Sequence, residues 1–160
     1  MAQNAPRPVS PGDLWKPLEF LIGTWEADSQ GGSAGAAASG TYTFRLELNG
    51  TVLARHSTSS GCKAPADFDC EHGDLLYIYR DASDQPCKAI YFDNEGHVIH
   101  YEVSTPAPGA AIFLSGASPS QPVFRLSYER KDSIMSGKFQ MRMPGQAAFT
   151  SYLEWSGRKH

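Results

Sequence analysis

The stretch GTYTFRLELNGTVLARHST, at residues 40–58, decides the fold of this chain. In its first half apolar and polar side chains alternate, so the large apolar side chains from Tyr42 to Leu48 share one face of a strand. Asn49-Gly50 follows them and is the strongest short signal for a β-hairpin turn. The stretch therefore predicts two antiparallel strands joined by a tight turn, with one face of the first turned toward an apolar interior.

The same pattern of short alternating segments and turn residues continues to the end of the chain. Two further short connections, at 93–96 and 130–133, join consecutive strands as hairpins and make the chain a meander. A meander with no second helical layer has to protect its edges, and closure into a barrel removes them. We therefore expect an all-β fold, a closed antiparallel up-and-down barrel of about ten strands. The predicted strands are 24–29, 40–48, 51–58, 74–80, 88–92, 98–104, 111–114, 123–130, 134–141 and 147–155.

A chain of 160 residues has the usual length of one domain. Residues 1–11, rich in Pro, Ala and Asn, are predicted to be a flexible leader, and residues 12–160 a single barrel domain. Between Leu14 and Ile22 apolar side chains recur at helical spacing, with Asp13 near the expected N-cap. This pattern predicts a short N-terminal helix before the first strand.

The composition excludes two classes of partner. A formal charge of −3 and the lack of any Lys/Arg cluster argue against a nucleic-acid partner. The longest apolar run, 18–22, is interrupted by Glu19, so no transmembrane segment is expected.

The first eleven residues lack the parts of a secretory signal, but a chain whose signal had been removed would look the same. A cytoplasmic and a periplasmic or secreted location both stay open.

The three cysteines are Cys62, Cys70 and Cys87, so at least one thiol has no partner within the chain. Cys62 and Cys70 could close a short loop in an oxidising compartment, whereas all three would be free thiols in the cytosol. Together with His72, the first two have a spacing that matches no zinc finger or ribbon. We therefore expect no metal site.

The strand faces favour a ligand cavity over a dry core. In the segment 74–103 both faces carry large side chains, so a semi-polar face can still be interior, which suits a cavity for a small apolar or amphipathic ligand. No cofactor is expected. The predicted ligand-binding residues are mostly aromatic and also include an imidazole and a carboxylate: Trp25, Tyr42, Phe44, Leu46, Tyr77, Tyr91, His100, Glu102, Phe124, Tyr128, Phe139 and Phe149.

His100 and Glu102 lie two residues apart and therefore share one face of a predicted strand. Inside the barrel they could orient the polar end of a ligand, or act as acid and base in a cofactor-free isomerase or hydrolase. On the outer face they would be an ordinary polar stripe. Binding of a small molecule is the first hypothesis, and the enzyme is the alternative.

The residues LEFLIGTW, from Leu18 to Trp25, contain the G-x-W that opens the first strand of lipocalins and related calycins. With the hairpin LNGTVL at 48–53 and the basic end Arg158-Lys159-His160, the chain resembles small bacterial lipocalin-like proteins of unknown function in the calycin superfamily. The resemblance implies an up-and-down barrel, a short helix plugging one end and Trp25 packed low in the barrel. It brings no catalytic residues.

The nitrobindin-like haem-binding barrels share the opening G-x-W, which makes haem a further alternative. Their additional Gly- and His-containing motifs are not found in this sequence, where the only C-terminal histidine is His160.

The connections predict which end of the barrel is open. The tight Asn49-Gly50 turn must lie at the end opposite to the long loops 29–40 and 59–73. Tight turns and a plugging helix leave no gap, so a ligand should enter between the long loops. We expect the 59–73 segment to lie over this mouth and to control entry.

Overall fold

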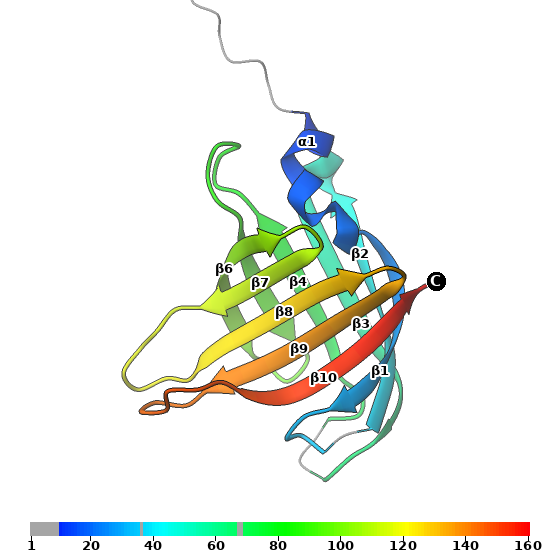
Figure 1. Ribbon diagram of the computed structural model, residues 1–160, viewed down its shortest axis with the longest axis vertical. Coiled ribbons are helices and arrows are strands. Elements are labelled where there is room, and N and C mark those ends of the chain that lie inside the picture. The colour runs from blue at the N-terminus through cyan, green and yellow to red at the C-terminus, as the bar shows by residue number, and fades with distance from the viewer. Residues whose placement is uncertain (1–9, 36, 67–68) are drawn as a thin grey trace, which may run out of the picture.

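The computed structural model describes residues 10–35, 37–66 and 69–160, and among them ten antiparallel strands close into one barrel (Figure 1). Each strand pairs with its neighbours along the chain, and the first pairs with the last to complete the ring. The predicted fold class is therefore confirmed. The strands are β1 (Gly23–Gly31), β2 (Ala37–Glu47), β3 (Val52–Lys63), β4 (Gly73–Tyr79), β5 (Lys88–Asp93), β6 (Val98–Ala107), β7 (Ala110–Ser115), β8 (Val123–Lys131), β9 (Ile134–Arg142) and β10 (Thr150–Lys159).

The N-terminal helix begins earlier than predicted. Helix α1 (Pro11–Trp15) is capped by Ser10, whose Oγ accepts a hydrogen bond of 3.3 Å from the backbone N–H of Asp13. Asp13 thus lies in the first turn and is not the cap, because a serine followed by proline is a stronger helix start. The chain then tightens into the 3₁₀ segment η1 (Lys16–Leu21). Of the predicted leader, residues 1–9 lie outside the described residues.

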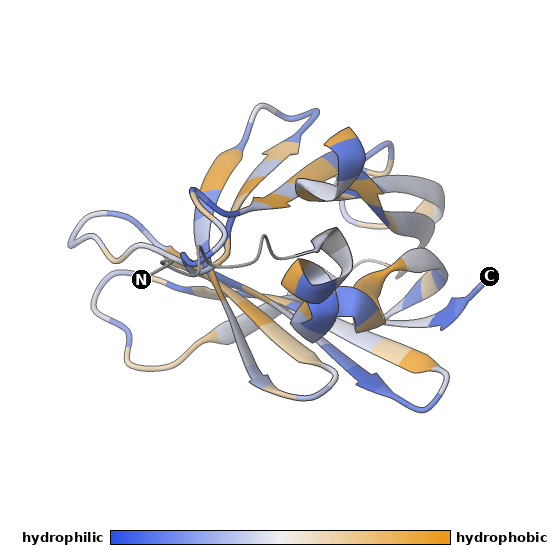
Figure 2. Ribbon diagram, turned by 90° about the horizontal axis from the view of Figure 1, so that it is seen from above, coloured by the Kyte–Doolittle hydropathy of each residue, from blue (hydrophilic) through white to orange (hydrophobic). Residues whose placement is uncertain are grey.

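This helical segment closes one end of the barrel, as expected. Figure 2 shows it lying across the ring of strands. Trp15, Leu18 and Leu21 are buried there against Trp25, which is 0% exposed. The Trp15 indole N–H donates to the carbonyl of Gly50 at 2.7 Å, and the Trp25 indole N–H donates to the carbonyl of Leu21 at 2.9 Å. These bonds tie the plug to the first strand and to the β2–β3 turn.

The predicted long loops are shorter than expected. Strand β1 continues to Gly31 and β2 already begins at Ala37, so most of the segment 29–40 is paired strand. Glycine makes this possible, because Gly32 has φ +114° and a Cβ there would lie 2.3 Å from the carbonyl oxygen of Tyr152. Strand β3 likewise extends through Lys63, which shortens the next connection to 64–72.

The cysteines divide into a pair and a single thiol. Cys62 and Cys70 form a disulfide, one of the two alternatives left open by the sequence, and Cys87 is buried and unpaired. The disulfide joins the end of β3 to the connection that leads into β4.

Within the described ranges, the structure contains no helix with the length and apolar character needed to cross a membrane.

Candidate ligand-binding cavity

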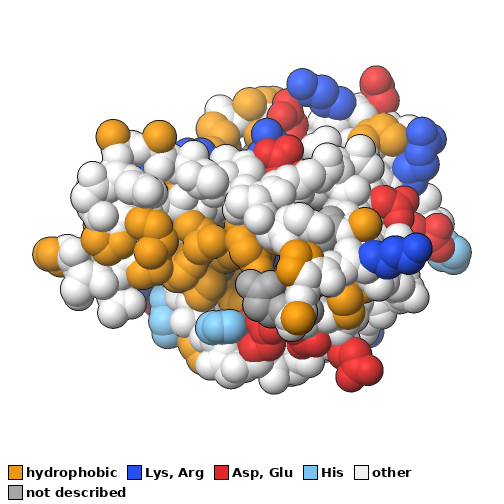
Figure 3. Space-filling model, turned by 90° about the horizontal axis from the view of Figure 1, so that it is seen from below, with side chains coloured by type: hydrophobic (Ala, Val, Ile, Leu, Met, Phe, Trp, Pro, Cys, Tyr) orange, Lys and Arg blue, Asp and Glu red, His pale blue; other side chains and the backbone are white. Residues whose placement is uncertain are grey.

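A cavity of about 960 Å³ occupies the end of the barrel opposite to the helix. Pockets for small molecules measure roughly 300–1,000 Å³, so this one is large enough for an organic ligand. Figure 3 shows the open end, where apolar side chains line a hollow that histidine and acidic side chains border. Cys62, at the end of β3, and Asp69 and Cys70 of the 64–72 connection line the cavity, so the predicted 59–73 segment reaches the predicted entrance. Whether it controls entry stays a prediction.

One wall of the cavity is apolar. Phe124 of β8 and Phe139 of β9 stack with their ring centroids 5.7 Å apart and their planes at 12°. Leu126, Met141 and Leu153 extend this wall along β8, β9 and β10. These side chains face inward because period-two alternation puts Arg125 and its polar neighbours outside. The wall offers a surface for the apolar body of a ligand.

The opposite wall contains a buried ion pair. Arg55 of β3 is 5% exposed and donates to the carboxylate of Asp74 on β4 and to the hydroxyl of Tyr128 on β8. Burial opposes the charge on Asp74, but Arg55 and His72 outweigh it and lower the pKa of Asp74 to about 2. Burial likewise opposes the charge on Arg55, and Asp74 more than restores it, so the pKa of Arg55 is raised. Both side chains are therefore ionised at neutral pH.

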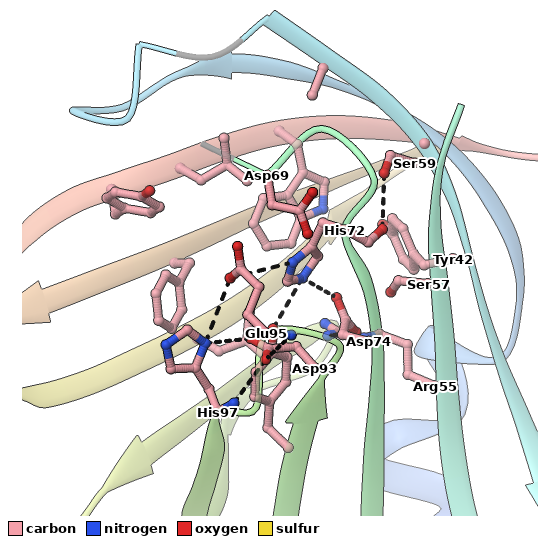
Figure 4. Close-up of a pocket in the computed structure, with 18 of the residues that line it drawn as sticks. Tyr42, Arg55, Ser57, Ser59, Asp69, His72, Asp74, Asp93, Glu95 and His97 are labelled. Carbon is pink, nitrogen blue, oxygen red and sulfur yellow. Dashed lines mark hydrogen bonds and ion pairs between the residues drawn. The ribbon is translucent and has the colours of Figure 1, made fainter. Parts of the chain in front are cut away.

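A chain of polar contacts runs from this pair toward the mouth (Figure 4). The Nε2 atom of His72 lies 3.2 Å from Asp74 Oδ2 and 3.1 Å from the hydroxyl of Tyr91. The Tyr91 hydroxyl in turn donates to Asp93 Oδ2 at 3.2 Å. The hydrogen bond to Asp74 raises the pKa of His72, against the smaller effect of burial. His72 is thus held in place by a carboxylate that is itself held by Arg55.

The rim of the mouth carries the residues best placed to hold a metal ion. Asp69, His72 and Glu95 each offer a ligand atom, and these atoms lie within 4.8 Å of one another. His72 Nδ1 is 4.0 Å from Glu95 Oε2, which is too long for a hydrogen bond. Asp93 belongs to a second such group, but its carboxylate already accepts bonds from the backbone and ring N–H groups of His97 at 2.9 and 2.8 Å. Asp93 therefore serves mainly to hold the turn.

Three hydrogen-bond donors of the cavity have no hydrogen-bond partner among the described residues. They are the Tyr42 hydroxyl, Arg55 Nε and the Trp155 indole nitrogen, and all three atoms are buried. Burial raises the pKa of Tyr42 strongly, and a hydrogen-bond contribution from the neighbouring Trp155 N–H lowers it by less. Tyr42 is therefore a protonated hydroxyl at neutral pH. Unpaired buried donors are rare in folded proteins and call for an explanation.

The position of Trp155 depends on a glycine. Its indole lies flat over Gly137 of the neighbouring strand, where a Cβ would come within 2.2 Å of the ring. No other residue allows the indole this close to the barrel wall. The glycine thus leaves room for Trp155 on the inner face beside Tyr128, whose ring centroid is 5.8 Å away.

Five of the predicted ligand-binding residues line the cavity: Tyr42, Tyr91, Phe124, Tyr128 and Phe139. Trp25 and Phe44 are also interior, with exposures of 0% and 1%, but they belong to the packed core away from the cavity lining. Trp25 and Phe44 support the cavity from the packed core and do not line it.

Three other predicted residues lie outside the cavity. Leu46 shares the inner face but is 38% exposed, because β2 is paired with β1 only as far as Phe44. Tyr77 is on the outer face, since Leu76 and Ile78 take the inner one, and its ring contacts exposed Phe92 at 6.4 Å.

Phe149 precedes β10, which starts three residues later than predicted. Its ring packs outside the cavity against two guanidinium groups, those of Arg125 and Arg142, at 4.0 and 5.0 Å.

The prediction that His100 and Glu102 face the interior is wrong. Both are exposed on the outer face of β6, opposite Ile90 and Lys88, because Tyr101 takes the inner position at 3% exposure. They do share a face, as expected, but it is the face toward solvent. The acid–base pair inside the barrel therefore does not exist.

His160 is equally remote from the cavity. Its Nδ1 lies 2.8 Å from Glu26 Oε1, and both side chains are largely exposed. The C-terminal histidine considered for haem is therefore on the exterior.

Sequence reasoning missed the polar wall. Arg55 and Ser57 follow buried Leu53 at period two along β3, which was the available signal for their inward direction. Their charge and polarity argued the other way. Asp74 gave no comparable signal, because it is charged and stands near the start of β4, directly after Gly73.

In a comparison with known proteins, no protein-family profile and no curated protein matches the sequence.

Proposed function

We propose that this protein binds a small molecule with an apolar body inside its barrel. The observation that carries the proposal is the cavity of about 960 Å³ at the end opposite to the plug. Small barrels either fill their interior with side chains or hold a small ligand there, and this barrel leaves one end unfilled. The stacked Phe124 and Phe139 rings offer aromatic surface to the ligand.

The lining favours an amphipathic ligand. One wall is made of apolar side chains from β8, β9 and β10, while the facing wall carries the Arg55–Asp74 pair and His72. Ligand pockets commonly combine an apolar majority with a few polar groups that fix orientation. We infer that the apolar body lies against Phe124 and Phe139, with its polar end toward Arg55.

We also propose kinship with the calycins. The support is the up-and-down barrel, the helical plug and the G-x-W at Gly23–Trp25, where Trp25 packs against the plug. The enzyme alternative lost its two residues when His100 and Glu102 were found outside.

Cavity filling tests the binding proposal. The probe is 6-propyl-2-(dimethylamino)naphthalene, and its affinity is measured by isothermal titration calorimetry for wild type and a Ser57→Phe variant. Ser57 lies on the inner face between Tyr42 and Asp74, so a phenyl ring there occupies ligand space. We expect binding to wild type and at least tenfold weaker binding to the variant.

The matched control is Ser127→Phe. Ser127 lies on the outer face of β8, between Ile112 and Lys138, and does not line the cavity. This variant should bind the probe as wild type does. No binding to wild type, or equal losses in both variants, would overturn the proposal. Native mass spectrometry of the purified protein would additionally show any molecule that it retains.

A further inference from the structure

We propose that the inner end of the cavity recognises a neutral carbonyl oxygen, as found in a ketone, ester or amide, through the unpaired donors of Tyr42, Trp155 and Arg55. This inference rests on the proposed function and goes on to name the chemical class of the ligand.

The three donors surround one side chain. The rings of Tyr42 and Trp155 each pack on the ring of Tyr128 with centroids 5.8 Å apart. Arg55 donates to the hydroxyl of the same Tyr128 through one terminal nitrogen and keeps its Nε without a partner. Donors from β2, β3 and β10 are thus gathered around Tyr128.

The ligand group must be an acceptor. An indole nitrogen and a guanidinium can only donate, and a tyrosine hydroxyl kept protonated by burial still has its proton to give. A buried donor without a partner costs free energy that an acceptor oxygen on a ligand would recover. The Trp155 N–H lies beside the Tyr42 hydroxyl, which can also accept, so an apolar ligand end at this position would leave Arg55 Nε and at least one donor of the Tyr42–Trp155 pair unsatisfied.

The charges around the cavity favour a neutral acceptor over an anion. The described lining includes four carboxylates, from Asp69, Asp74, Asp93 and Glu95, and one guanidinium, from Arg55. The charge of Arg55 is already paired with Asp74. A carboxylate ligand would enter a cavity with an excess of negative charge, whereas a carbonyl oxygen accepts hydrogen bonds without that repulsion.

A probe pair isolates the oxygen. The probes are 6-propionyl-2-(dimethylamino)naphthalene, which carries a ketone, and its 6-propyl analogue, in which a methylene replaces the carbonyl. Dissociation constants are measured by calorimetry for wild type, Tyr42→Phe and Trp155→Phe. Comparing the effect of each substitution on the two probes removes the difference in their hydrophobicity.

We expect Tyr42→Phe and Trp155→Phe each to weaken binding of the ketone probe by about three- to tenfold, which corresponds to the loss of one hydrogen bond. Neither variant should lose more affinity for the propyl probe than for the ketone probe. Tyr42→Phe should leave the affinity for the propyl probe unchanged. Tyr77→Phe, a tyrosine on the outer face of β4, is the matched control and should change neither affinity.

The outcomes separate the two proposals. If neither probe binds wild type, the binding function itself fails. If both probes bind but Tyr42→Phe affects them equally, the barrel binds ligands and carbonyl recognition is wrong. The 6-carboxylate of the same naphthalene should bind more weakly than the ketone, and tighter binding would overturn the preference for a neutral group.

Discussion

Replacing Asp74 by asparagine should remove a pH-dependent part of the stability of this barrel. Asp74 is 9% exposed, and its carboxylate contacts both Arg55 and His72. Asparagine keeps the shape and one acceptor oxygen but cannot ionise. The free energy of unfolding of the Asp74→Asn variant should therefore lack the contribution of the charge.

The size of this contribution follows from the pKa of Asp74, which folding lowers from 3.8 to about 2. One pKa unit corresponds to about 1.4 kcal/mol, so the ionised carboxylate stabilises the fold by about 2 kcal/mol at neutral pH. Because folding lowers the pKa of Asp74, this stabilisation is fully present above the unfolded-state pKa of 3.8. It is lost as the pH falls through the folded-state pKa of about 2. About 1 kcal/mol of it should be gone by pH 3.

Urea unfolding at pH 7 and pH 3 measures the effect, with Asp81→Asn as the control. Asp81 pairs with Lys88 on the surface at 2.6 Å with 57% of its side chain exposed, so its loss should cost no more than about 0.5 kcal/mol. The difference between wild type and Asp74→Asn should shrink by about half between the two pH values. A difference that is equal at both, or as small as that of the control, would refute the reasoning.

Two further predictions concern packing and the mouth. Gly137→Ala must displace the Trp155 ring and should lower the free energy of unfolding by about 1–3 kcal/mol. The control Gly116→Ala has no atom within 4 Å of the added Cβ and should change this free energy by less than about 0.5 kcal/mol. Similar values for the two variants in chemical denaturation would contradict the close contact between Gly137 and Trp155. Replacing Cys62 and Cys70 by serine should cost about 2.5 kcal/mol, since the bond spans eight positions of sequence. Wild type treated with dithiothreitol should then unfold like the double variant, and unchanged stability after reduction would argue against the bond.

The strands and their closure could be predicted because both depend on local signals. Alternation along 40–48 and the Asn49-Gly50 turn need only neighbouring residues, and ten such units leave few architectures besides a barrel. The ends of strands were less predictable. Gly32 reads as a loop residue, yet it lets the chain approach Tyr152 and continue the pairing with β10.

The inner face was predictable only where one side of a strand is clearly apolar. Phe124, Leu126 and Tyr128 met that condition and do face inward. In β4 and β6 both faces carry large side chains, so Tyr77 and His100 were placed on the wrong side. Hydrophobicity cannot decide which face of such a strand points inward, because that depends on the register with the neighbouring strands.

The contacts within the polar wall could not be predicted from single segments. Arg55, Asp74 and Tyr128 come from three strands and meet only when the ring closes. Each of them is unremarkable in its own stretch of sequence. Their combination exists only in the folded barrel.

The plug at one end also constrains the kinetics of exchange. Because Trp15, Leu18 and Leu21 are buried at the helical end, a ligand bound as proposed would arrive and depart through the same opening. The end of the ligand that lies deepest in the cavity would be the first part to enter and the last to leave. By microscopic reversibility, a change confined to the mouth that does not touch the bound molecule alters the rates of arrival and departure by the same factor. For a ligand bound as proposed, a substitution at the mouth but outside the cavity lining would therefore change the residence time without altering the equilibrium constant.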